Sequence, residues 1–214
     1  MFLSPDILLV VVPVFLLAIC LHEAAHAFVA DRLGDPTARE LGRLTLNPLR
    51  HLDVIGTIVF FVAGFGWAKP VPVDPRRLRD PLRDGVWIAA AGPGANVVLA
   101  LASAILLRVV VASGGAGAGT VTAGVASFLN LSVTVNLVLA LFNLIPLPPL
   151  DGSKVLLGLL PRDAAARFAR VTAAGPAILF GLIILGNVSG HSFFGAVLWP
   201  AVDFVRGVLM FGMG

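Results

Sequence analysis

Residues 7–30 read ILLVVVPVFLLAICLHEAAHAFVA, an apolar stretch that contains three ionisable side chains, His22, Glu23 and His26. At about 1.5 Å per residue, a helix of this stretch would be roughly 36 Å long, enough to cross a hydrocarbon core of about 30 Å. Ionisable side chains inside hydrocarbon are costly and by default mark a functional site. The stretch therefore predicts a membrane-spanning helix that carries chemistry.

The composition of the whole chain supports a membrane protein. Of the 214 residues, 58% are hydrophobic and 13% are charged, whereas soluble domains have about 25% charged residues. The net charge of +3 comes from 15 basic and 12 acidic residues with no uninterrupted basic block, so no nucleic-acid partner is expected. Cys20 is the only cysteine, which excludes an intrachain disulfide and a cysteine metal cluster.

Further apolar stretches predict an all-α polytopic membrane protein with about five transmembrane helices. The predicted spans are residues 7–30, 86–112, 121–144, 171–188 and 193–211. Residues 54–68 would form a helix of only about 22 Å, so this stretch is predicted to be a re-entrant or β-hairpin-like segment at the cytosolic membrane edge. We expect one membrane-embedded domain over residues 1–214, with a core at 7–160 and C-terminal helices at 171–211.

The basic residues predict the orientation in the membrane. Nine of the 15 Lys and Arg residues lie within residues 31–85 and four within residues 154–170. The positive-inside rule places both regions in the cytosol and the N-terminus outside. We expect an integral protein of a prokaryotic cell membrane, in contact with the lipid bilayer.

The segment His22-Glu23-Ala24-Ala25-His26 has a metal-binding spacing. Histidines at i and i+4 lie on one face of a helix and can share a tetrahedral zinc ion. Glu23 is rotated by about 100° from His22 and could act on water there as a general base. The alternative, polar side chains that merely pack between helices, leaves three ionisable groups in hydrocarbon unexplained.

A catalytic zinc site needs three protein ligands and one open position. Asp151 follows a charge-free span at its cytosolic end and matches the histidines in depth if residues 54–68 do not cross, so it is the expected third ligand. Its alternative role is an N-cap before Gly152. His51 and Asp53, in a cytosolic loop, remain possible ligands.

Five motifs occur in order along the chain. They are HEAAH at 22–26, LNPLRHLD at 46–53 followed by Gly56-Thr57, GWAKPVPV at 66–73, AGPGAN at 91–96 and NLIPLPPLDG at 143–152. Together they resemble the site-2 proteases, intramembrane zinc metalloproteases that cut transmembrane segments of other proteins. The resemblance covers about residues 15–160, and Val54 departs from it, because a proline commonly follows the aspartate.

The resemblance implies one Zn²⁺ per chain, held by His22, His26 and Asp151, with Glu23 as the general base. It also implies that Asn143 stabilises the tetrahedral oxyanion, although a hydrogen bond between helices is an equal alternative. The implied activity is hydrolysis of peptide bonds in or near transmembrane segments of single-pass membrane proteins, as in regulated intramembrane proteolysis, near the cytosolic side. The short form, without a PDZ or CBS domain, is expected.

The segment Lys69-Pro70-Val71-Pro72-Val73 predicts a one-sided edge strand. In an extended chain successive residues direct their backbone polar groups to opposite edges. Pro70 and Pro72 lie on one edge and cannot donate, whereas Val71 and Val73 keep donors on the other. We expect the segment to bind an extended substrate; the alternative is a stiff proline linker.

Two other functions fit parts of the sequence. A metal-dependent transporter or channel could use the same polar cavity, but the inverted repeat common in transporters is not visible in the sequence. A catalytically silent protein that binds membrane helices would have no need of Glu23. Asn96 is expected to pack between helices or to line a cavity.

Overall fold

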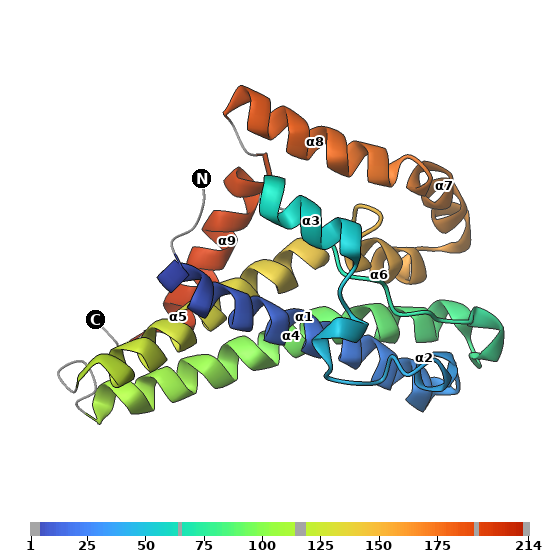
Figure 1. The fold of residues 1–214 in the computed structure, drawn as a ribbon. Coiled ribbons are helices and arrows are strands. Elements are labelled where there is room, and N and C mark those ends of the chain that lie inside the picture. Colours follow the sequence, from blue (N-terminus) through green and yellow to red (C-terminus); the bar gives the residue numbers. More distant parts are fainter. Residues whose placement is uncertain (1–4, 64–65, 114–118, 191–192, 212–214) are drawn as a thin grey trace.

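The computed structural model describes residues 5–63, 66–113, 119–190 and 193–211, and helices dominate these ranges (Figure 1). The α-helices are α1 (Pro5–Leu33), α2 (Thr37–Glu40), α3 (Val54–Ala63), α4 (Pro81–Ala112), α5 (Gly119–Asn143), α6 (Asp151–Leu159), α7 (Arg162–Thr172), α8 (Gly175–Ser189) and α9 (Phe193–Leu209). Two 3₁₀ turns, η1 (Pro48–Arg50) and η2 (Pro75–Arg77), precede α3 and α4. The all-α prediction is confirmed.

Within the described ranges, three helices are long and apolar enough to cross a membrane. These candidate spans are Leu8–Leu33, Pro81–Ala112 and Val121–Asn143. The prediction of five spans is not confirmed, because α8 has 15 residues and α9 has 17, fewer than the roughly 20 that a span needs. Arg162–Arg170 and Gly175–Gly186 pass the same test only as a pair bent by 58°.

Helices α1, α4 and α5 form the bundle that carries the site, with α4 against both of the others. The contact between α4 and α5 includes Ala100 and Ala104 on α4, and Val133 and Leu137 on α5, all buried. Small side chains let helix backbones approach closely in lipid. Val202 of α9 is buried in the same cluster, which docks α9 on the bundle.

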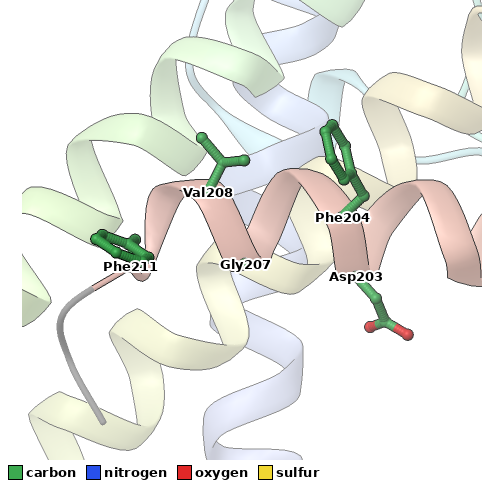
Figure 2. Close-up of a pocket in the computed structure, with 5 residues that line it drawn as sticks. All are labelled: Asp203, Phe204, Gly207, Val208 and Phe211. Atoms are coloured by element: carbon green, nitrogen blue, oxygen red, sulfur yellow. The ribbon is translucent and has the colours of Figure 1, made fainter.

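The outer surface of the bundle is apolar, as expected for a protein that faces lipid. Val98, Ile105 and Val109 of α4 are each more than half exposed. Figure 2 shows a shallow hollow on α9, lined by Asp203, Phe204, Gly207, Val208 and Phe211. We find no sequence-predicted site residue among those that line it.

Helix α3 is shorter than a membrane span, and the re-entrant form of residues 54–68, of which 64–65 lie outside the described ranges, stays a prediction. Its 10 residues correspond to about 15 Å. The β-hairpin-like form is not confirmed: in the described ranges we find no strand, only an isolated antiparallel bridge between Leu52 and Ala68.

Candidate active site

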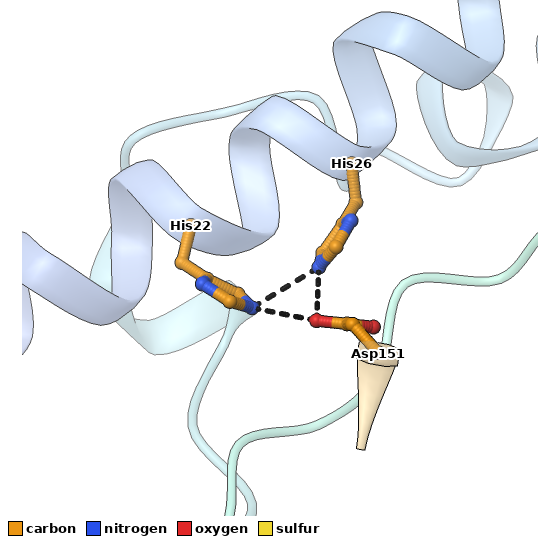
Figure 3. Close-up of side chains that lie close together, drawn as sticks. All are labelled: His22, His26 and Asp151. Atoms are coloured by element: carbon orange, nitrogen blue, oxygen red, sulfur yellow. Dashed lines mark hydrogen bonds and ion pairs between the residues drawn. The ribbon is translucent and has the colours of Figure 1, made fainter. Parts of the chain in front are cut away.

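Three buried side chains from distant parts of the sequence meet at one point (Figure 3). The Nε2 atoms of His22 and His26 lie 3.1 Å apart. Asp151 Oδ2 lies 3.2 Å from the first and 3.1 Å from the second. The histidines are one turn apart on α1 and Asp151 is the first residue of α6, so the bundle must form before the three can meet.

The hydrogen bonds on the far side of each ring determine which nitrogen faces this point. His26 Nδ1 donates to the Ile88 carbonyl oxygen over 2.6 Å, and a carbonyl can only accept. His22 Nδ1 donates to Asn96 Oδ1, also over 2.6 Å. When the imidazoles are neutral, as metal ligands must be, each therefore presents the lone pair of Nε2 to Asp151.

This donor set fits a zinc ion. Two Nε2 lone pairs and a carboxylate oxygen have no proton to share, so their convergence is repulsive unless a cation lies between them. Zinc–nitrogen bonds of 2.0–2.1 Å in a tetrahedron place neighbouring ligands about 3.3 Å apart, close to the observed separations of 3.1 and 3.2 Å. Three protein ligands leave the fourth position open, as in catalytic sites.

Gly92 of α4 keeps space at the same point. A Cβ atom at this residue would lie 2.6 Å from His22 Nε2 and would overlap His26 Nε2 as well. Together with Ile88 and Asn96, Gly92 forms a stripe at i, i+4 and i+8 that faces the two histidines. Helix α4 thus supplies both the partners of the rings and the space beside them.

Asp151 is held as a carboxylate next to the histidines. Lys154 Nζ lies 3.4 Å from Asp151 Oδ1, and this ion pair favours the charged carboxylate. The N-cap of α6 is Leu150, and Asp151 occupies the first helical turn. Asp151 is therefore not the N-cap, which leaves its carboxylate free to face α1.

The loop before α6 brings Asp151 into place through a close backbone approach. A Cβ atom at Gly152 would lie 2.6 Å from the Ile145 carbonyl oxygen and would overlap Leu144. Only glycine allows the start of α6 to pack so tightly on the residues that follow α5. In the pair Asp151-Gly152, the first residue therefore supplies the carboxylate and the second allows the close packing that positions it.

Glu23 lies on α1 beside the histidine pair and is half-buried. No hydrogen bond or ion pair joins its carboxylate to another residue in the described part of the chain. Asn143, the other residue expected to act in catalysis, donates its Nδ2 to the Leu139 carbonyl oxygen of its own helix over 3.0 Å. This bond is neither a contact with the cluster nor the hydrogen bond between helices that was the alternative.

His51 and Asp53 serve the loop before α3. His51 Nε2 donates to the Thr45 carbonyl oxygen over 2.7 Å. Asp53 Oδ1 accepts from the Gly56 N–H over 2.8 Å, at the start of α3. The metal-type cluster found among the described residues contains neither of them.

The segment Lys69–Val73 lies outside the helices and is anchored at its start and just beyond its end. The Lys69 N–H donates to the His51 carbonyl oxygen over 2.8 Å, and Arg43 Nη2 donates to the Lys69 carbonyl oxygen over 2.6 Å. Beyond the segment, the Asp74 N–H donates to Asp35 Oδ2 over 2.7 Å. Lys69 therefore uses both of its backbone groups within the chain.

Val71 and Val73, further along this segment, differ from Lys69 in their backbone hydrogen bonding. Within the ranges that the structure describes, the backbone groups of Val71 and Val73 make no hydrogen bond. The side chain of Val73 packs against the buried residues Ala30, Leu78 and Ile88. The segment is thus held by its ends and by one side chain, and the backbone groups of Val71 and Val73 are left without partners among the described residues.

The contacts of Asn96 and Ile88 with the two histidines are not among the roles predicted from the sequence. Asn96 was expected only to pack or to line a cavity, yet it contacts His22 directly. The available signal was the spacing of Ile88, Gly92 and Asn96, which puts an amide on the same face as a glycine in an apolar helix. Ile88 contacts His26 through its backbone carbonyl, which every residue has, so the side-chain sequence could not indicate this contact.

Comparison with known proteins gives consistent results. Residues 107–186 match Peptidase family M50. "Putative zinc metalloprotease YwhC" of Bacillus subtilis is 41% identical over 183 residues, which cover 86% of this chain and 81% of that protein. "Putative zinc metalloprotease Rip2" of Mycolicibacterium smegmatis is 31% identical over 198 residues, 90% of this chain and 73% of that protein. No solved structure matches. The chain therefore belongs to Peptidase family M50, the site-2 proteases, and is a zinc metalloendopeptidase of the membrane.

Proposed function

We propose that this membrane metalloprotease cleaves peptide bonds in or near the transmembrane segments of single-pass membrane proteins, as in regulated intramembrane proteolysis. The observation that carries the proposal is the convergence of His22 Nε2, His26 Nε2 and Asp151 Oδ2 on one point, within a candidate membrane span. His26 lies seven residues, about 10 Å, before the end of that span at Leu33. A substrate would have to reach the site at this depth.

His22, His26 and Asp151 would hold one zinc ion per chain. Zinc, when bound, supplies Lewis acidity that polarises the scissile carbonyl and makes water a better nucleophile. Glu23 has a carboxylate free of other partners in the described structure, which suits a general base. It would accept a proton from the attacking water and pass it to the leaving amine. Asn143 would stabilise the oxyanion only after releasing its bond to Leu139.

Pairing with Val71 and Val73 would hold the substrate in an extended form. A helical substrate keeps its scissile amide in internal hydrogen bonds, so it must become extended before attack. An edge strand that is anchored at Lys69 and Asp74 but unpaired at the two valines could accept it by β-strand addition. Pro70 and Pro72 would leave the opposite edge without donors, so that one peptide binds in one register.

Arg43 connects this strand electrostatically with the proposed base. Its guanidinium is buried and holds the Lys69 carbonyl oxygen. Burial lowers the pKa of Arg43, although the negative charge of Glu23 opposes this shift.

Two observations favour proteolysis over the alternatives. A silent helix-binding protein would gain nothing from three ligand atoms and a carboxylate without partners beside them. A transporter commonly contains an inverted repeat, which is not visible in this sequence.

The basic regions would place the N-terminus outside and the active site near the cytosolic side of a prokaryotic cell membrane. We propose that residues 1–214 form one membrane-embedded domain.

Arg50 and Arg79 are both exposed and lie on either side of α3 in the sequence, so they can test this orientation. Cysteines at these positions, in a Cys20→Ser background, should both resist an impermeant thiol reagent added to intact cells. Labelling of only one would mean that α3 crosses the membrane.

Metal content is the direct test of the proposed ligands. Purified wild-type protein should contain one zinc per chain, and His22→Ala, His26→Ala or Asp151→Ala should lose most of it, because each removes one of three ligand atoms. His51→Ala is the matched control, since His51 is a buried histidine outside the cluster. Elemental analysis of the folded proteins measures the result. Equal zinc in wild type and the double histidine variant would contradict the assignment.

The substrate strand makes a separate prediction. Val71→Pro should slow cleavage roughly two- to twelvefold, because loss of one net hydrogen bond costs about 0.5–1.5 kcal/mol. Val71→Thr keeps the amide and a similar shape, and should be mild. Zinc content should not change in either variant. Cleavage by folded Val71→Pro at the wild-type rate would show that the segment is a linker.

A further inference from the structure

A line of buried polar side chains leads from His22 into the bundle, away from the proposed metal point. It consists of Asn96 on α4, Asn136 and Ser132 on α5, and Ser103 on α4. Asn96 and Asn136 are both 0% exposed. Buried amides in a membrane-spanning bundle are costly unless they are hydrogen-bonded, so their arrangement calls for an explanation.

The amide of Asn96 can adopt only one of its two orientations. Its Nδ2 donates to the Ala18 carbonyl oxygen over 3.2 Å and to Asn136 Oδ1 over 2.8 Å. Because a backbone carbonyl can only accept, the NH₂ group must lie on the side of Ala18. The opposite atom, Oδ1, is then the one that faces His22 Nδ1 at 2.6 Å.

The amide of Asn136 is oriented in the same way. Its Nδ2 donates to the Ser132 carbonyl oxygen over 2.8 Å, so its Oδ1 points to Asn96. Ser132 Oγ in turn hydrogen-bonds to Ser103 Oγ over 2.8 Å. The Ser132 and Ala18 carbonyl oxygens therefore fix the orientation of the two amides, and Asn96 Oδ1 is the acceptor presented to His22. The bond between the two serines lies beyond these amides and does not orient them.

We infer that Asn96 is a positioning residue for metal binding, which keeps the proton of His22 on Nδ1 and the Nε2 lone pair directed at the metal point. The inference rests on the proposed metal site and assigns a role in it to Asn96, a residue outside the HEAAH motif. His26 has a backbone carbonyl as its partner, whereas His22 depends on one side chain. Loss of the partner of a ligand histidine typically weakens metal binding about 10–100-fold.

Zinc affinity, measured by competition with a chromophoric chelator on the purified full-length protein in detergent, tests this role. Asn96→Leu, similar in size but without an acceptor, should bind zinc about 10–100-fold more weakly. Asn96→Asp, protonated in this buried place, keeps one oxygen as the acceptor for Nδ1–H and an O–H to donate to Asn136 Oδ1, and it should stay within about tenfold of wild type. The visible spectrum of the Co²⁺-substituted protein should change in Asn96→Leu and remain close to that of wild type in Asn96→Asp.

Ser103→Ala is the matched control, because it removes a buried hydrogen bond of the same line without touching His22; its zinc affinity should equal that of wild type. If Asn96→Leu does not fold, Asn96→Ala replaces it in the same comparison. Wild-type affinity in the variant without an acceptor, or an equal loss in Asn96→Asp, would overturn the inference. His22→Ala distinguishes failure of this inference from failure of the proposed metal site. If His22→Ala retains zinc, the proposed metal site itself is wrong.

Discussion

Replacement of Glu23 by Gln should almost abolish peptide hydrolysis and leave zinc bound. The amide has nearly the same shape as the carboxylate but cannot accept a proton from water. General acid–base catalysis contributes about 10²–10⁴-fold to rates, and we expect a loss in this range. Because Glu23 is not part of the three-atom cluster, the metal content should remain at the wild-type level.

The measurement is cleavage of candidate single-pass transmembrane substrates by the purified protein, with and without a chelator. Wild type should cleave only when loaded with zinc, and Glu23→Gln should be inactive in both conditions. His22→Ala serves as the contrast, because it should lose activity and zinc together. A Glu23→Gln protein that cleaves at the wild-type rate would remove Glu23 from the mechanism, and activity that survives a chelator would remove the metal.

Gly92→Ala should eliminate most of the activity through a single methyl group. The new Cβ would lie 2.6 Å from His22 Nε2, at the point where the three ligand atoms converge. Overpacking of this kind costs about 1–3 kcal/mol, and a misplacement of about 1 Å at a reacting centre can cost about 10²-fold in rate. We expect cleavage to fall about 100-fold and zinc affinity to fall with it.

Gly94→Ala is the control for this substitution. It lies two residues along the same helix, and a Cβ atom there would meet nothing within 4 Å. Both changes favour the helix to the same extent, since alanine is the better helix former. Cleavage rate and zinc affinity, compared with helix content from circular dichroism, therefore isolate the contact with the histidines. Equal activity in the two variants would mean that Gly92 does not border the site.

The helix of the histidine motif could be predicted from the sequence because its signals are local. An apolar stretch of sufficient length predicts a span, and histidines at i and i+4 share a face of any α-helix. Helix α1 (Pro5–Leu33) confirms both points. The predicted count of five spans is not confirmed, because the positions at which helices break depend on more than the local apolar composition. Composition does not reveal where a helix breaks, and α8 begins at Gly175 and is followed by Gly190 with φ of +71°.

The sequence alone determined that the chain is an all-α membrane protein and which residue types carry its chemistry. Only the tertiary structure decided which groups form hydrogen bonds with the histidines and which groups border them. His22 meets Asn96 and His26 meets Ile88 because α1 packs against α4, although the partners are 74 and 62 positions apart in the sequence. The same packing brings Gly92 against the rings, while Asn143 bonds to its own helix. Hydrogen bonds across helices depend on register and rotation, which periodicity along one helix does not specify.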